Sequence, residues 1–466
     1  MNPVATLLIG ALLLSACTVG PEYEAPEINA PPQFLSQDVL STLNEGFSDQ
    51  TVAADWWTGF GDDTLNALVE AGLENNFRIA AAAARVREAR ARVRLAGAGD
   101  ALRAEAGASA DLQARSDSGS NRQSATSAGV SGDLDVTLPL DAFGRTRREV
   151  EAARAGLDAA EAELKGIVLG VSSDIASEYL GMRGNQRQLE LLRESVLLQE
   201  KTLTIVRSRF ESGLAPELDL RRAETSVESL RAGIPPLEED IRNFRNRIAR
   251  LAGAFPGAYE NVLNEPRPTP AYDSPIPQLL PLQVLSTRAD VRQAEANLKQ
   301  AIAGIGVAEA EYYPVFELRG ALSIGAGGGV SGPAVLIGTL SALVQQVLAD
   351  GGVRDANFEI ASARADAALA DYEQALREAT EEVEAVLAAI RSSGRRQVSL
   401  NKAVGSSRRS FAQVETLYQQ GLISFLDVVD AQRVLADAEQ DLARERTNYA
   451  TQIAVLFRVL APARSG

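Results

Sequence analysis

The feature that most constrains the fold of this sequence is a long internal repeat. RFESGLAPELDLRRAET, residues 209 to 225, aligns with LYQQGLISFLDVVDAQR, residues 417 to 433, at a separation of about 208 residues. A second pair of segments, 140 to 164 and 349 to 373, repeats at nearly the same separation. Because 466 residues exceed one ordinary core, these matches predict two equivalent halves joined by a linker.

Each half contains apolar residues at intervals of seven, a spacing typical of coiled coils. Val150, Leu157, Leu164 and Val171 follow this spacing in the first half, and Val428, Leu435, Leu442 and Leu456 follow it in the second. Residues 142 to 212 contain no proline, so roughly 70 residues can form one helix. We expect one helix, two strands and then two very long helices in each half. Alanine on several helix faces favours a closed ring of helices over the alternative, an ordinary bundle.

Three segments alternate apolar and polar residues, which predicts strands with one apolar face, and a fourth apolar segment of similar length predicts one more strand. They span 104 to 115, 129 to 140, 315 to 325 and 335 to 346, the last being more uniformly apolar. A strand of about 10 to 12 residues suits a tilted crossing of a lipid bilayer. Four strands cannot close a membrane barrel, for which about eight are needed, so several chains must contribute strands.

Cys17 is the only cysteine, and it follows the apolar run LLIGALLLSA. A lone cysteine cannot form an intramolecular disulfide, and the chain has no histidine to activate a catalytic thiol. A run of about ten residues suits a signal peptide and is too short to span a bilayer. Leu14-Ser15-Ala16-Cys17 resembles the lipobox of bacterial lipoproteins, in which the signal is cut before an acylated cysteine. The segment before it has no Lys or Arg, which departs from an ordinary signal peptide.

Composition excludes several classes of function. A formal net charge of −16 argues against nucleic acid as a partner. The absence of histidine removes the commonest metal ligand and the commonest general base. Asp427 and Asp430 form an acid pair, but no nucleophile or metal-ligand cluster accompanies them. We therefore expect no enzyme activity, no catalytic residues, no bound metal and no cofactor.

GPEYEAP (20 to 26), ADWWTGFGDDTLNALVEAGLENN (54 to 76) and the two repeated motifs together make the mature chain resemble the lipoprotein branch of the TolC-like outer-membrane efflux factors. The resemblance implies an α+β membrane protein: a homotrimer whose 12-stranded β-barrel, four strands per chain, continues into a long α-helical coiled-coil barrel. It also implies an outer-membrane exit duct that docks a periplasmic adaptor protein and, through it, an inner-membrane RND-type transporter. Multidrug efflux and lipid attachment to the outer membrane belong to the same expectation.

The expected domain boundaries follow from the repeat, the lipobox and the prolines. In chain order they are a lipoprotein signal peptide (1–16), a lipid-anchored N-terminal segment (17–63), repeat 1 (64–253), a proline-rich linker expected to be extended (254–285), repeat 2 (286–461) and a C-terminal tail (462–466).

The repeated motifs contain the candidate site residues. Gly213-Leu214 and Gly421-Leu422 interrupt long helices, so we expect hairpin tips at these positions. The family resemblance implies that these tips dock the adaptor. The alternative is that they are mere helix reversals.

The resemblance also implies a periplasmic gate. Acids matching Asp427 and Asp430 line the closed aperture in the family, and a tyrosine matching Tyr418 hydrogen-bonds an acid matching Asp219. An arginine that some members carry is Ile423 here, so that part of the lock is either missing or supplied by another residue such as Arg433. The alternative is that both aspartates are solvated acids at a helix start.

Two other functions remain open at the level of sequence. One is the exit duct of a type I protein secretion system, and the other is a lipid-anchored periplasmic coiled-coil tether. A tether would explain the heptads and Cys17 but not the alternating strands.

Overall fold

The computed structural model of the chain describes residues 18–28, 31–35, 55–116, 124–274, 281–326 and 334–460. Cys17, the expected lipid attachment residue, lies outside these ranges. The chain forms two compact units. Unit 1 contains Met1–Glu27, Arg85–Glu161 and Gln293–Glu373, and unit 2 contains Ile28–Ala84, Ala162–Arg292 and Gln374–Gly466.

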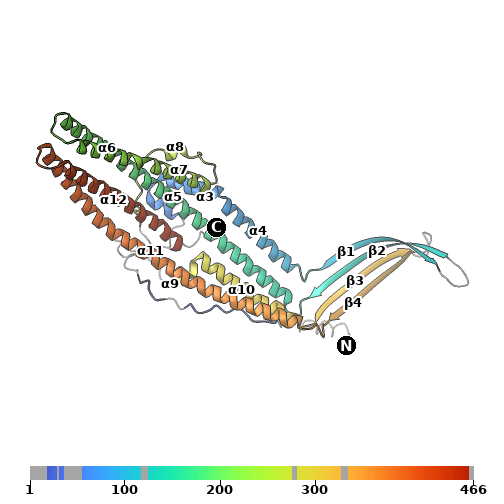
Figure 1. Ribbon diagram of the computed structural model, residues 1–466. Helices are drawn as coiled ribbons and strands as arrows, with labels where there is room; N and C mark the ends of the chain where they lie inside the picture. Colours follow the sequence, from blue (N-terminus) through green and yellow to red (C-terminus); the bar gives the residue numbers. More distant parts are fainter. Residues whose placement is uncertain are drawn as a thin grey trace. The chain divides into compact units, whose positions relative to one another are not determined.

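The order of elements confirms the internal repeat (Figure 1). The helices are η2 Trp56–Phe60, α3 Asp63–Asn75, α4 Phe77–Gly97, α5 Arg145–Glu211, α6 Glu217–Ala232, α7 Ile234–Leu251, α8 Glu260–Leu263, α9 Pro281–Thr287, α10 Ala289–Ala310, α11 Val353–Gln419 and α12 Phe425–Leu460. In each half, one helix (α4 or α10) leads into two strands and then into a helix of 67 residues (α5 or α11). No described helix combines the length and the apolar character that a membrane crossing would need.

The four predicted strands are all present and form one antiparallel sheet. They are β1 Arg103–Ser116, β2 Ser124–Leu140, β3 Val315–Ala326 and β4 Ala334–Gln345, in the spatial order β1-β2-β3-β4. Ala106, Leu134 and Leu322 lie in one cross-strand row, and the neighbouring row contains Glu105 and Asp135. Because residues in one row share a face, the sheet has one apolar and one more polar face.

One expectation about repeat 1 is wrong. Its second very long helix is broken into α6 and α7 at Gly233, whereas the equivalent α12 runs for 36 residues. Pro235 and Pro236 explain the break, because proline lacks the backbone donor of a helix interior but is tolerated in a first turn.

The proline-rich linker contains no helix or strand over residues 264–274. Its ends are less extended than expected: α8 lies just before this stretch, and α9 begins at Pro281, inside the range assigned to the linker.

Unit 2 has an apolar core centred on the WWTGF motif. The indole of Trp56 stacks on Phe457 near the end of α12, with ring centroids 5.0 Å apart. Tyr272 of the linker packs against the same Phe457 ring at 5.0 Å. The Tyr179 hydroxyl on α5 donates a 2.7 Å hydrogen bond to Asp62, the N-cap residue of α3. Burial and this hydrogen bond raise the pKa of Tyr179 to about 12, so the core holds a neutral tyrosine.

Candidate functional site

The predicted interruptions of the long helices are two tight turns of the same type. Gly213 and Gly421 have φ values of 73° and 76°, in the left-handed region that favours glycine. In the first turn the Gly213 amide donates to Phe210 O at 2.9 Å, and the Leu214 amide donates to Arg209 O at 2.8 Å. This pair of bonds is a Schellman motif, which ends a helix by satisfying its last carbonyl groups. The second turn makes the equivalent bonds after α11, so both tips reverse the chain with the same backbone geometry.

Both tips expose apolar side chains. Leu214 is 71% exposed and Leu422 is 67% exposed. Leu218 and Leu426, four residues further along, are also exposed. Sequence reasoning named the first pair and missed the second, although the repeat aligns Leu218 with Leu426. Each tip therefore carries two exposed leucines, one in the turn and one in the first turn of the helix that follows.

Behind the tips lies a small apolar cluster, the tip core, drawn from both halves. Its buried members are Val206, Leu220, Ala223, Phe411, Tyr418, Phe425, Val428 and Leu435. They come from the two hairpins, α5–α6 and α11–α12, so the tip core joins the repeated motifs to each other.

Tyr418 is buried in the tip core and contacts Arg209 of α5. The Arg209 guanidinium lies 5.0 Å from the centroid of the Tyr418 ring, and its Nη1 donates to the Tyr418 carbonyl oxygen at 3.2 Å. Burial raises the pKa of Tyr418; Arg209 opposes this rise and Asp219 adds to it. Within the described part of the chain, the Tyr418 hydroxyl and the Asp219 carboxylate form no hydrogen bond.

The two candidate gate acids are exposed at the start of α12. Asp427 accepts hydrogen bonds from the amide (3.0 Å) and hydroxyl (2.6 Å) of Ser424. The hydroxyl and then the amide hold the pKa of Asp427 below its usual value, because both favour the charged carboxylate. Asp430 pairs with Arg433 on the same helix at 2.8 Å. In one chain, both acids thus have the local partners expected of acids at a helix start.

Residues 18–27, here called the N-terminal strap, are held on unit 1 by a set of hydrogen bonds. Arg148, which is only 4% exposed, donates from Nε to Val19 O at 3.0 Å and from Nη2 to Gly20 O at 2.8 Å. The Val19 amide donates to Phe143 O at 3.1 Å, just beyond the end of β2. Further along, the Tyr23 hydroxyl donates to Glu295 of α10 at 3.1 Å.

Sequence reasoning missed the contacts of the strap, because no local pattern connects the strap to Arg148. These contacts also include Thr18, the residue that follows Cys17 in the sequence. Thr18 Oγ1 accepts a 3.0 Å hydrogen bond from Arg147, in the first turns of α5.

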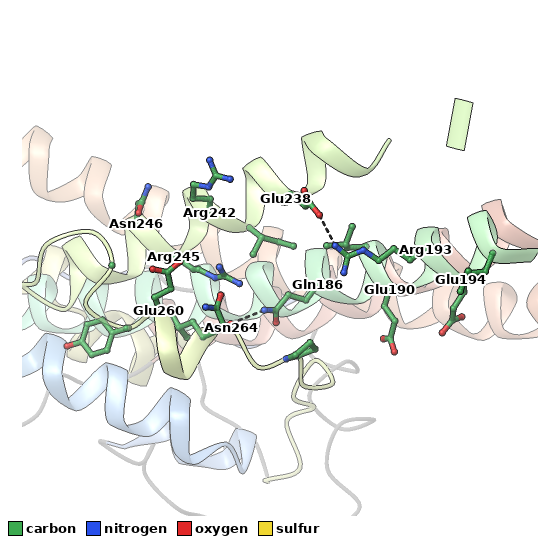
Figure 2. A pocket seen from close by; sticks show the side chains of 17 residues that line it. Gln186, Glu190, Arg193, Glu194, Glu238, Arg242, Arg245, Asn246, Glu260 and Asn264 are labelled. Atoms are coloured by element: carbon green, nitrogen blue, oxygen red, sulfur yellow. Dashed lines mark hydrogen bonds and ion pairs between the residues drawn. The ribbon is translucent and has the colours of Figure 1, made fainter. Parts of the chain in front are cut away.

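Unit 2 also contains a cavity of about 670 Å³ lined by residues of α5, α7, α8 and the start of the linker (Figure 2). Arg193 on its wall pairs with Glu238 at 2.7 Å. The charged lining residues are Arg193, Arg242, Arg245, Glu190, Glu194, Glu238 and Glu260. Acids and bases both line the cavity, so its overall charge does not favour a ligand of one sign.

Comparison with known proteins connects both halves of the fold to one family. A family model described as outer membrane efflux protein matches residues 68–254 and 280–461. Nodulation protein T of Rhizobium leguminosarum bv. trifolii is 33% identical over 96% of this chain and 94% of the relative. Cation efflux system protein CusC of Escherichia coli O6:H1 is 28% identical over 95% of this chain and 94% of the relative.

A solved structure of the outer-membrane channel OprN has the same fold, with a TM-score of 0.88. It is 29% identical, and the alignment covers 96% of this chain and 99% of that chain. The chain therefore belongs to the outer membrane efflux protein family and is an outer-membrane efflux channel.

Proposed function

We propose that this efflux channel is the exit duct of a tripartite pump and that three copies form it together. The observation that carries the proposal is the four-stranded sheet, in which β1 and β4 each pair on one side only within the described residues. Lipid offers no hydrogen bonds to an open strand edge, so membrane-inserted sheets must close. Three copies would supply 12 strands, which exceeds the minimum of about eight for a closed barrel.

The mass of the detergent-extracted protein tests this assembly. We expect a mass near three chains and stepwise conductance when the protein is added to planar lipid bilayers. A folded monomer that remains inserted in the outer membrane would rule out the shared barrel. A stable trimer without conductance would support the assembly but contradict the duct.

We also propose that the chain is anchored to outer-membrane lipid through acylated Cys17. The lone cysteine, the preceding apolar run and the fixed position of Thr18 support this proposal. Mass spectrometry should find residues 1–16 absent and acyl mass on the peptide that begins at Cys17. An intact Met1 with a free thiol would contradict the anchor.

The exposed leucines support the tips as the docking surface for a periplasmic adaptor protein. Replacing Leu214 or Leu422 with Asp should abolish efflux without changing trimer yield, because a charge opposes burial at an apolar contact. Val398, which is exposed on α11 away from the tips, offers a matched control as Val398→Asp. Normal efflux in both tip variants would leave the tips as simple helix reversals.

Asp427 and Asp430 support a gate, because threefold symmetry would repeat each carboxylate around the axis. Such rings attract cations into a narrow mouth. Replacing both residues with Ala should weaken block of the channel by divalent cations in planar bilayers. Unchanged cation block would place the aperture elsewhere.

The remaining partner in this proposal is an inner-membrane RND-type transporter, reached through the adaptor. The relatives differ in their named roles, nodulation in one and cation efflux in the other, so they do not indicate one cargo. Crosslinking in native membranes would identify the adaptor and the pump. Recovery of an ABC-type secretion ATPase instead would favour the alternative, a type I protein secretion duct.

A further inference from the structure

We propose that the cavity in unit 2 binds an organic carboxylate, with Arg245 as its charged contact and with the apolar part of the ligand against the cavity wall. This inference goes beyond the proposed duct, because every lining residue belongs to unit 2 and none lies at the tips or in the sheet. The volume of about 670 Å³ falls within the range of about 300 to 1,000 Å³ that is usual for small-molecule sites.

At one end of the cavity the charged side chains compensate one another. Arg193 pairs with Glu238 at 2.7 Å. Glu190 pairs at 2.6 Å with Arg187, which does not itself line the cavity, and Glu194 lies 4.0 Å from the same arginine. Figure 2 shows Glu190, Arg193 and Glu194 together at this end. Their charges therefore leave little attraction for a ligand.

The opposite end of the cavity has more positive than negative charge. Figure 2 shows Arg242, Arg245 and Glu260 there, together with Asn246 and Asn264. Within the part of the chain that the structure describes, neither of these two guanidinium groups forms a hydrogen bond or an ion pair. Two cations without partners and one acid therefore remain after the ion pairs at the other end are set aside.

Arg245 provides a donor that lacks an acceptor. Its Nε is fully buried and has no hydrogen-bond partner among the described residues. Such donors are rare in native proteins, because they lose their hydrogen bonds to water and gain none in return. Burial lowers the pKa of Arg245; Glu260 opposes this shift, and Arg183 and Arg242 add to it. A bound anion would satisfy the donor and offset the repulsion among the three guanidinium groups.

Arg183 adds positive charge beside the cavity. It is 0% exposed, and its Nη1 donates to Gln186 Oε1 at 2.8 Å and to Glu265 O at 2.6 Å. Both acceptors are neutral, and its Nε and Nη2 have no hydrogen-bond partner among the described residues. Because no described carboxylate pairs with this guanidinium, its charge adds to the attraction for an anion at Arg245.

The chemistry of the lining favours a carboxylate over a phosphate. The planar donors of arginine match the two oxygens of a carboxylate. Glu260 repels a doubly charged phosphate more strongly than a singly charged carboxylate. Leu189, Ile241 and Leu263 are buried side chains of the same lining, so they offer an apolar surface to the rest of the ligand.

Isothermal titration calorimetry of the full chain in nanodiscs tests this site with hydrocinnamate, a carboxylate that carries a phenyl ring. Arg245→Met should weaken binding roughly 10-fold or more, because it removes a hydrogen bond between charged groups. Arg250→Met, at an exposed position of α7 outside the cavity, is the control and should bind like the wild type. The neutral amide of the same acid should bind as weakly to the wild type as the acid binds to Arg245→Met. Absence of binding to the wild type, or equal binding of acid and amide, would overturn the proposal.

Glu260→Gln distinguishes a ligand site from a purely structural role of Arg245. If Glu260 served only to stabilise Arg245, its loss would lower the melting temperature and leave hydrocinnamate affinity unchanged. In a carboxylate site, glutamine removes a repulsive charge, so affinity should rise severalfold. Unchanged or weaker binding in Glu260→Gln would therefore overturn the proposal even if Arg245→Met failed to fold.

Inorganic phosphate tests the preference for a carboxylate. We expect it to displace hydrocinnamate only weakly, and displacement at equal concentration would show that the assignment of a carboxylate is wrong. These measurements do not use conductance. A failure of the carboxylate site would thus leave the proposed duct standing, and a trimer without conductance would leave the site standing.

Discussion

Arg148 donates a 2.8 Å hydrogen bond to the carbonyl oxygen of Gly20, although the two residues are 128 positions apart. The same guanidinium bonds Val19 O, so one buried cation fixes the start of the described chain. Hydrogen bonds from charged donors contribute about 1.5 to 3 kcal/mol each. This contact therefore contributes strongly to holding the N-terminal strap on unit 1, together with the bonds of Val19, Thr18 and Tyr23.

Replacing Arg148 with Met should release the strap. Amides of residues 18–27 should exchange hydrogen roughly 10- to 100-fold faster, because local opening would lose two strong hydrogen bonds. Hydrogen exchange with mass spectrometry measures this directly. Arg154→Met, at an exposed position of the same helix, is the control and should leave exchange unchanged. Equal protection in both variants would show that other contacts hold the strap.

Gly306 and Gly304 on α10 allow a paired test of the close packing around Arg148. A Cβ at Gly306 would lie 2.8 Å from Arg148 Cγ, whereas a Cβ at Gly304 would meet nothing within 4 Å. Gly304→Ala should stabilise the protein by about 0.5 to 1 kcal/mol, because alanine favours helix. Gly306→Ala should destabilise it by about 1 to 3 kcal/mol through overpacking. Thermal unfolding in detergent should shift in opposite directions, and a common shift would contradict the close approach.

Gln432 in α12 is a polar residue at a buried position. It is 6% exposed, and within the described chain its side-chain Oε1 and Nε2 have no hydrogen-bond partner. Replacing it with Leu should raise stability by about 1 to 3 kcal/mol, because the unsatisfied amide is removed at similar volume. Exposed Gln420→Leu should have little effect on thermal unfolding. A lower melting temperature for Gln432→Leu would indicate that assembly supplies the missing partner.

Ser424→Ala should change how cation block depends on pH. Ser424 lowers the pKa of Asp427 by hydrogen-bonding its charged form. The contribution of these bonds to stability is present above the unfolded pKa and is lost as pH falls through the folded pKa. Without the hydroxyl, the pKa should rise toward the ordinary value of about 3.9, so the variant should lose cation block at a higher pH. Conductance at several pH values checks this, and coincident titrations would exclude Asp427 from the block.

Much of the fold was predictable because its signals are local. Alternation over single segments located three of the strands, a uniformly apolar segment located the fourth, and the glycines of the repeated motifs located both tips. Pro235 and Pro236 also mark the break at Gly233 locally, whereas symmetry between the repeats predicts an unbroken helix there.

The contacts of Arg148 and Arg209 could not be predicted from the sequence. Each bonds a residue more than a hundred positions away, and arginines on exposed helix faces elsewhere in the chain look the same in sequence. The candidate gate acids show the reverse case. Ser424 and Arg433 lie within three residues of them, so their local partners follow from helical spacing.

The two outer strands of the sheet differ in a way that matters before any assembly exists. β1 contains charged residues such as Glu105 and Asp111, whereas β4, AVLIGTLSALVQ, contains none. The unpaired backbone groups of an uncharged edge strand can form hydrogen bonds with a strand of another chain, and charged side chains are a common protection against such pairing. During its passage through the periplasm, a single chain is therefore most vulnerable to aggregation along β4. Until β4 pairs with a strand of another copy, chaperones must protect this edge or the copies must associate rapidly.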